Sequence, residues 1–190
     1  MTKKIQGANK LFLYVIAIFL TTTLSAYEES SYDVVYESDL YEVRFYEERL
    51  VVQTSYGNED NGFMKLFRYI SGSNKNSEKI AMTTPVTQSN TGENMVMQFY
   101  LPSVFDKSNT PQPDDNSVEI SSIKAGYFAA IKYSGRSSER NFKKHSKILK
   151  EELKENKVVI MGPPIKATYN GPFTLPPFRR NEAMYLVDWK

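Results

Sequence analysis

The feature that most constrains the fold is a helical pattern followed by a strand pattern, between Gly62 and Val86. In the first part, apolar side chains recur at i, i+3, i+4 and i+7, which predicts one apolar stripe of a helix. The members of this stripe are Phe63, Leu66, Phe67 and Ile70. Gly72 predicts the end of the helix, and the segment 79–87 predicts a strand that contains a proline.

A short helix with one apolar stripe buries that stripe against a neighbouring sheet, which indicates an α+β fold. We therefore expect Phe63, Phe67 and Ile70 to be buried, because they lie on the stripe. Lys65 and Arg68 lie on the other side of the helix, and we expect them to be mostly exposed.

Period-two alternation predicts further strands on both sides of this helix, and a second helix follows them. Ser138 and Glu139 are typical of a helix start, with the inner face carried by Phe142, Leu149 and Leu153. The predicted strands span residues 41–46, 50–55, 95–101, 118–123, 127–133, 166–169 and 184–189.

The two halves of the chain resemble copies of one unit. A shift of about 77 residues places Val43 on Ile120, and a shift of about 79 places Phe63 on Phe142. A larger shift of about 87 places Pro85 on Pro172, as loop insertions would produce. The pattern predicts two ββαββ units, each too small to bury its own apolar face.

The first 26 residues have the layout of a secretory signal peptide. Three lysines precede an apolar run from Leu11 to Leu24, and Ser25-Ala26 offers small residues for cleavage. The run has 14 residues, fewer than the roughly 20 that cross a bilayer, although an uncleaved anchor is the alternative. We expect cleavage near Ala26, a mature domain of residues 27–190, and export to the periplasm or the medium.

Composition excludes several function classes for the mature domain. The full chain has 24 basic and 22 acidic residues, so losing three lysines changes the net charge from +2 to −1. A near-neutral domain offers no electrostatic footprint for nucleic acid and no basic patch for a membrane. The absence of cysteine from the sequence excludes disulfides, thiolate metal sites and cysteine nucleophiles.

Three motifs resemble one family closely, the SOUL haem-binding proteins. They are the helix and strand of residues 62–86, the opening strand Tyr41-Glu42-Val43-Arg44, and the closing loop Arg179-Arg180-Asn181-Glu182. The resemblance runs from about Tyr32 to Trp189 and fits an exported, bacterial-type member. It implies a curved, mostly antiparallel sheet or distorted barrel with two flanking helices. It also implies wider kinship with small-molecule-binding domains of drug-sensing regulators.

The resemblance implies haem binding in an apolar cleft beside the first helix. The residues that match the family's cleft on that helix are Met64, Lys65 and Arg68, and the closing loop adds Phe178, Arg179 and Arg180. The proline-rich loop, which spans residues 161–182 and holds five of the nine prolines, also presents Phe173, so its aromatic and arginine side chains can meet a flat, carboxylated porphyrin. The alternative is a loop that only closes the edge of the sheet.

His145 is the single histidine of the chain, and haem iron is held by His, Met, Cys or Tyr. It lies at the edge of the buried face of the second helix, so we expect a packing role and haem binding without an axial protein ligand. No catalytic motif is visible, and we expect a non-catalytic binding protein for a tetrapyrrole or similar flat amphipathic molecule. The alternatives are a hydrolase-type enzyme on this fold, or an envelope protein that acts through a partner surface.

Overall fold

The structure is a computed structural model that describes residues 27–57, 61–92 and 94–190. The expected signal segment, residues 1–26, lies outside the described residues. The helices are α2 (Gly62–Ile70), α3 (Glu139–Glu155) and the short 3₁₀ helix η1 (Pro176–Phe178). The strands are β1 (Glu28–Glu29), β2 (Asp33–Glu37), β3 (Glu42–Tyr46), β4 (Arg49–Tyr56), β5 (Thr83–Thr84), β6 (Val86–Asn90), β7 (Met95–Tyr100), β8 (Val118–Ile123), β9 (Gly126–Tyr133), β10 (Val159–Ile160), β11 (Ile165–Thr168) and β12 (Asn181–Asp188).

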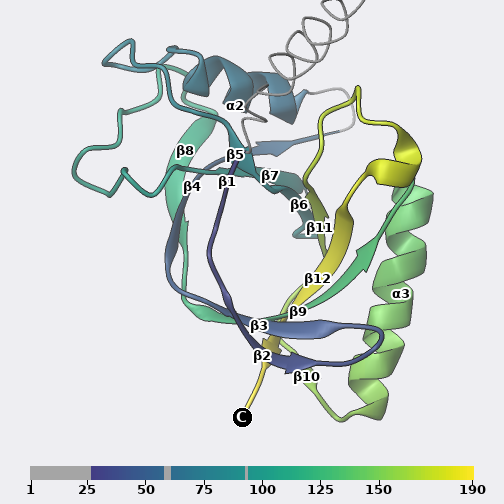
Figure 1. Cartoon of the computed structure of the whole chain (residues 1–190). Coiled ribbons are helices and arrows are strands. Elements are labelled where there is room, and N and C mark those ends of the chain that lie inside the picture. The colour runs from purple at the N-terminus through teal and green to yellow at the C-terminus, as the bar shows by residue number, and fades with distance from the viewer. Residues whose placement is uncertain (1–26, 58–60, 93) are drawn as a thin grey trace, which may run out of the picture.

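One curled sheet forms the frame of the domain. Its strand order is β2-β3-β9-β12-β11-β6-β7-β4-β8, with β10 on β12, and every pairing within it is antiparallel. The sheet curves into a half-barrel, and α2 and α3 both lie outside the curve (Figure 1). The expected α+β fold, with a curved antiparallel sheet and two flanking helices, is confirmed. The internal repeat stays a prediction.

Helix α2 packs through a face that only partly matches the predicted stripe: Leu66 and Ile70 of the stripe are buried, as expected for Ile70, whereas its two phenylalanines are not. Leu66, Tyr69 and Ile70 are buried, in a cluster with residues of β4 and β7. Phe63 and Phe67 are 39% and 43% exposed, so the expectation that they are buried is wrong. The helix carries apolar residues around a wide arc, and the sheet covers only the part centred on Leu66 and Ile70.

Glycine at the start of α2 permits this close approach to the sheet. A Cβ atom at Gly62 would lie 2.8 Å from the ring of Tyr56 on β4. Asn61 caps the helix, because its side chain accepts a hydrogen bond from the backbone N–H of Met64. At the other end, Gly72 has a φ of +112°, which is the backbone geometry that ends many helices.

Helix α3 follows its sequence pattern. The side chain of Ser138 accepts a hydrogen bond from the backbone N–H of Asn141, and Glu139 lies in the first turn. Phe142, Leu149 and Leu153 are buried against β9 and β12, as expected.

The N-terminal strap, residues 27–37, was not expected to contain strands. Its strand β1 pairs in parallel with β5, and its strand β2 pairs with β3 at the edge of the sheet. The strap therefore runs from the small two-stranded β1–β5 sheet to the edge of the curled sheet, and Tyr32 packs on Tyr46 with ring centroids 5.1 Å apart. The predicted strand at 79–87 is wrong in its first part, because regular pairing begins only at Thr83.

Candidate functional site

The two helices leave a gap on the outer face of the sheet. Helix α2 contacts β4, β7 and β8, whereas α3 contacts β9, β10 and β12. Strands β6 and β11 lie between these two groups in the sheet order, so neither helix covers them. Their outward-facing residues alternate with inward-facing ones, and Thr168 pairs with Val86 while Lys166 pairs with Gln88. These four residues form the floor of a cleft between the helices.

The cleft has a volume of about 390 Å³ and a largely apolar lining. Phe63 and Phe67 form the wall on the α2 side, where their rings stack with centroids 6.0 Å apart and planes at 13°. Ser137 lies on the side from which α3 begins. The remaining lining residues are Tyr27, Met82, Thr84, Tyr169, Asn170, Gly171 and Pro172. A cleft of this size and character suits a flat, mostly apolar molecule.

One charged side chain belongs to the cleft lining. Lys166 is 8% exposed, and its Nζ lies 2.9 Å from Oε1 of Glu139 in the first turn of α3. Beside it, the hydroxyls of Ser137 and Thr168 are 3.0 Å apart. The polar groups therefore gather on the α3 side of the cleft, and the aromatic wall stands on the α2 side.

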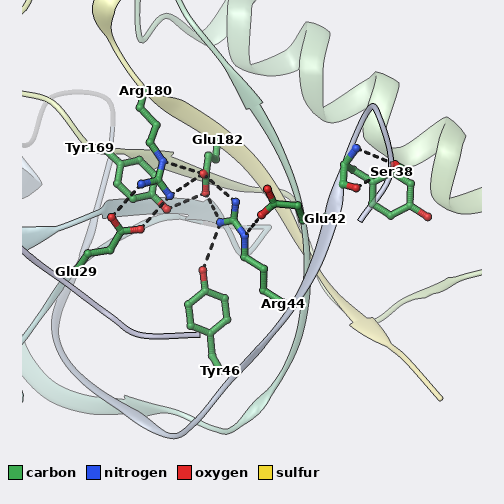
Figure 2. Close-up of polar contacts among 9 residues, drawn as sticks. Glu29, Ser38, Glu42, Arg44, Tyr46, Tyr169, Arg180 and Glu182 are labelled. Carbon is green, nitrogen blue, oxygen red and sulfur yellow. Dashed lines mark hydrogen bonds and ion pairs between the residues drawn. The ribbon is translucent and has the colours of Figure 1, made fainter. Parts of the chain in front are cut away.

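A buried charge network occupies the inner, concave face of the sheet (Figure 2). Glu182 on β12 is fully buried and accepts hydrogen bonds from Arg44 Nη1 at 2.7 Å and Nη2 at 3.1 Å. Its carboxylate also accepts from Tyr169 Oη at 2.7 Å and from Arg180 Nε at 3.0 Å. Four donors on one carboxylate, with excellent geometry, indicate a structural role for this network.

The pKa values of the network follow from these contacts. Burial alone would raise the pKa of Glu182, but the hydrogen bonds and charge of Arg44, helped by Arg180, hold the pKa below its ordinary value. Burial and the neighbouring Glu182 carboxylate raise the pKa of Tyr169 well above its ordinary value. Glu182 is therefore ionised at neutral pH, and Tyr169 is a proton donor that keeps its proton.

The two arginines of the closing loop are engaged within the protein. Arg180 forms a bidentate pair with Glu29 of the strap, with both N–O distances at 2.9 Å, and lies 3.7 Å from the centre of the Tyr169 ring. Arg179 donates to the carbonyl oxygens of Thr174 at 2.7 Å and Pro172 at 2.6 Å. Arg180 thus ties the strap to the sheet, and Arg179 braces the proline-rich loop.

The structure does not bring the other predicted cleft residues together around the cleft. Met64 is 40% exposed on α2 and is not part of the cleft lining. Lys65 and Arg68 border a smaller hollow of about 250 Å³ with the loop after β7, on the other side of the helix from Phe63 and Phe67. Phe173 is 98% exposed and directly follows the lining residue Pro172, and Phe178 is 76% exposed at the end of η1; neither belongs to the cleft lining.

His145 lies in α3 and does not line the cleft. Its ring stacks on Tyr133 with centroids 4.0 Å apart and planes at 2°. Its Nδ1 lies 2.8 Å from the backbone carbonyl oxygen of Asn141, one turn earlier in the helix. These contacts describe a packing residue.

Within residues 27–57, 61–92 and 94–190, no group of three His, Asp or Glu side chains is arranged to hold a metal ion. In the same part of the chain, no helix has the length and apolar character needed to span a bilayer.

A second cavity, of about 400 Å³, lies between the strap, the start of β4 and the loop after β7. The guanidinium of Arg49 faces the ring of Tyr46 at 3.9 Å, and its Nε and Nη2 have no hydrogen-bond partner among the described residues. The cavity lining contains four glutamates: Glu28, Glu29, Glu47 and Glu48. This acid-rich lining does not suit a carboxylated ligand.

The residues that sequence reasoning missed are those of the cleft itself. The helical stripe predicts that Phe63 and Phe67 belong to the core, and no sequence motif indicates Met82, Lys166 or Glu139 as site residues. For Lys166 the sequence offers only a lysine within the predicted strand 166–169, and the pairing of this strand with β12 and β6 that buries the lysine is seen only in the structure. For the two phenylalanines no signal existed, because an apolar residue that lines a cleft follows the same helical spacing as one in the core.

Solved structures of other proteins share this fold at low sequence identity. The solved C-terminal domain of EcmrR has the same fold, with a TM-score of 0.61 and 12% identity over 84% of this chain and 99% of that one. A hydrolase from Listeria innocua matches with a TM-score of 0.57 and 10% identity over 81% of this chain and 94% of that one. Likeness at this level of identity concerns the fold alone. A search of the curated proteins finds no match.

The sequence model of a family described as SOUL heme-binding protein matches residues 27–186. This range contains the helix and strand of residues 62–86, the opening strand and the closing loop. It also contains both walls and the floor of the cleft. The chain therefore belongs to the SOUL heme-binding protein family.

Proposed function

We propose that this domain binds a flat, amphipathic small molecule of the tetrapyrrole class, haem among them, in the cleft between α2 and α3, without catalysing a reaction. The observation that carries the proposal is the pair of stacked phenylalanines that α2 exposes at the cleft, Phe63 and Phe67. Membership of a heme-binding family supports the same class of ligand.

The exposed phenylalanines supply a driving force for binding. Fully burying a phenylalanine side chain is worth roughly 1.5–3 kcal/mol. Phe67 is 43% exposed, so a ligand that covered its exposed part would gain about 0.6–1.3 kcal/mol from this residue. Phe63, at 39% exposed, offers a similar amount, and a flat ring system can cover both rings at once because they are stacked.

The cleft residues fit the porphyrin ring of haem better than they fit its iron. The aromatic wall and Met82 would hold the apolar ring, and Lys166 offers a cation for a carboxylate. Haem would supply a planar apolar surface with two carboxylates, and an iron centre. His145 lies outside the cleft lining, and the Tyr169 hydroxyl is engaged by Glu182. The other lining residues of a type that can hold haem iron are Tyr27 and Met82, and we propose that both pack against the ring instead. We therefore propose binding by packing and carboxylate contacts, with no axial ligand from the protein.

The enzyme alternative finds little support at the cleft. A hydrolase would need a base with a pKa adjusted toward neutrality. Tyr169 lines the cleft, but its pKa is raised well above its ordinary value, and its hydroxyl already donates to Glu182. The cleft residues thus favour binding over proton transfer.

We further propose that the domain works outside the cytoplasm, after loss of residues 1–26. The lysine-led apolar run and the small residues Ser25-Ala26 support this proposal. Tyr27 lines the cleft, so cleavage after Ala26 would place the new N-terminus beside the ligand. With a net charge of −1, the mature domain is proposed to act on a small molecule and to bind neither nucleic acid nor membrane.

The proposal is tested by titrating the mature domain with haem and with protoporphyrin IX, its metal-free counterpart. Phe67→Ala should weaken both affinities by roughly 3- to 10-fold, the equivalent of about 0.6–1.3 kcal/mol. Met64→Ala is the matched control, because Met64 is 40% exposed on the same helix but lies outside the cleft lining. It should leave both affinities within about twofold.

The two titrations also separate the alternatives. Equal losses from Phe67→Ala and Met64→Ala would mean that the ligand does not occupy the cleft. Absence of binding by either porphyrin would reject the ligand class and favour a role through a partner surface. Much tighter binding of haem than of protoporphyrin IX would show that the iron is ligated.

A further inference from the structure

We propose that the Lys166–Glu139 pair is a carboxylate-exchange site, at which a carboxylate of the ligand takes the place of Glu139 on the Lys166 ammonium. This inference rests on the proposed function and defines its ligand class further: a flat apolar molecule that carries a carboxylate. It places the acid-recognising group on β11, away from the arginines of the closing loop.

The geometry of Lys166 suits this role. The side chain rises from the cleft floor, is 8% exposed, and donates from Nζ to Oε1 of Glu139 at 2.9 Å. An ammonium group has three N–H donors. Glu139 is the one hydrogen-bond acceptor that the described part of the chain gives Lys166, which leaves two donors for a ligand.

Glu139 is well placed to leave. Its side chain is 57% exposed, whereas that of Lys166 is 10% exposed. A carboxylate with that much solvent access regains water when it moves away, and the ligand carboxylate that replaces it keeps the mostly buried Lys166 ammonium paired. A ligand carboxylate that replaced it would be held in the less exposed part of the site, beside the hydroxyls of Ser137 and Thr168.

The charge of the lining selects an acid over a base. Among the described residues that line the cleft, Lys166 is the one whose side chain is charged at neutral pH, and the α-amino group that cleavage would create at Tyr27 would add a second positive charge. A lipophilic cation would meet this ammonium in a lining that offers no further carboxylate, because Glu139 is already paired with Lys166. The buried carboxylate of Glu182 cannot serve this purpose, because it is already paired with Arg44 and Arg180 on the inner face of the sheet. A carboxylate-bearing ligand, in contrast, satisfies the free donors of Lys166.

The test compares protoporphyrin IX with its dimethyl ester, which has the same ring and no ionised carboxylate. Affinities are measured by fluorescence titration for the mature domain and for Lys166→Met, Lys166→Arg and Glu139→Gln. Lys166→Met keeps the apolar stem and should weaken binding of the acid about tenfold or more, while the ester stays within about twofold. Lys166→Arg should retain the preference for the acid.

Glu139→Gln should change the affinity for the acid in the opposite direction to Lys166→Met. It removes the competing carboxylate from Lys166 and should tighten binding of the acid, again with little change for the ester. This result is hard to explain by damage to the fold, because a destabilised cleft would weaken both ligands. It also keeps the proposal testable if Lys166→Met folds poorly.

The outcomes distinguish this inference from the proposed function. If Phe67→Ala weakens both porphyrins but Lys166→Met affects acid and ester alike, the cleft binds the ring and the exchange site is rejected. If Glu139→Gln weakens or does not change binding of the acid, the exchange is rejected as well. If neither Phe67→Ala nor Lys166→Met changes any affinity, the ligand does not bind in the cleft and the proposed function fails.

Discussion

The buried carboxylate of Glu182 should be one of the most sensitive positions of the domain. Its two oxygens accept four hydrogen bonds, two from Arg44 and one each from Tyr169 and Arg180. The Glu182→Gln substitution keeps the size of the side chain, but it replaces one acceptor oxygen with an NH₂ group. That NH₂ group would face N–H or O–H donors of the network and could accept no hydrogen bond from them. It also leaves Arg44, which is 1% exposed, with only the partly exposed carboxylate of Glu42 as a countercharge.

The expected cost follows from this burial. Removing one partner of a buried ion pair typically costs about 3–5 kcal/mol, because the other charge stays buried without compensation. For a domain of this size, each 1 kcal/mol lowers Tm by roughly 2–4 °C, so the predicted decrease is about 6–20 °C. Glu42→Gln is the matched control, because Glu42 also contacts Arg44, at 2.7 Å, but its side chain is 25% exposed. It should cost less than about 1 kcal/mol.

The effect should also depend on pH. The pKa of Glu182 is lower in the folded protein than its ordinary value near 4.5, so its ionised form stabilises the fold above that value. This contribution is lost as the pH falls through the folded-state pKa. The difference in unfolding free energy between wild type and Glu182→Gln should therefore have its largest value at pH 7 and decrease as the pH falls. Denaturant unfolding from pH 7 to pH 3 measures it. A cost below about 1 kcal/mol at pH 7 would refute the reasoning.

Two further predictions concern the ligand and the N-terminus. His145→Ala should leave haem affinity within about threefold, roughly 0.7 kcal/mol, because the ring stacks on Tyr133 outside the cleft lining. A large loss with a change in the Soret band would instead identify His145 as an iron ligand. N-terminal sequencing of the exported protein should begin close to Tyr27, because the apolar run before it is too short to span a bilayer. Recovery of the chain with Met1 in a membrane fraction would contradict this expectation.

Local sequence determined much of the secondary structure. The pattern of residues 118–123 predicts β8 with the bounds that the structure shows, and Ser138 with Glu139 marks the start of α3. The stripe of Phe142, Leu149 and Leu153 is buried as expected. These features depend on period and on cap chemistry, which act over one or two turns of chain.

The burial of α2 was decided by tertiary packing. Its apolar residues at positions 63, 64, 66, 67, 69 and 70 cover a wide arc of a nine-residue helix. Periodicity therefore allows more than one face to be buried. In the structure the sheet covers Leu66, Tyr69 and Ile70, whereas Phe63 and Phe67 stay partly exposed and line the cleft.

The ion pairs at and near the site could not be predicted from the sequence either. Lys166 meets Glu139 across 27 residues, and Arg180 meets Glu29 across 151 residues. Sequence determined that these residues are charged and that the motifs belong to a haem-binding family. Only the tertiary structure decided which charges meet, because the curled sheet places β6 and β11 between two helices and the pairing of β1 with β5 brings Glu29 to Arg180, just before β12. Long-range pairing of this kind depends on strand order and register, which no local pattern specifies.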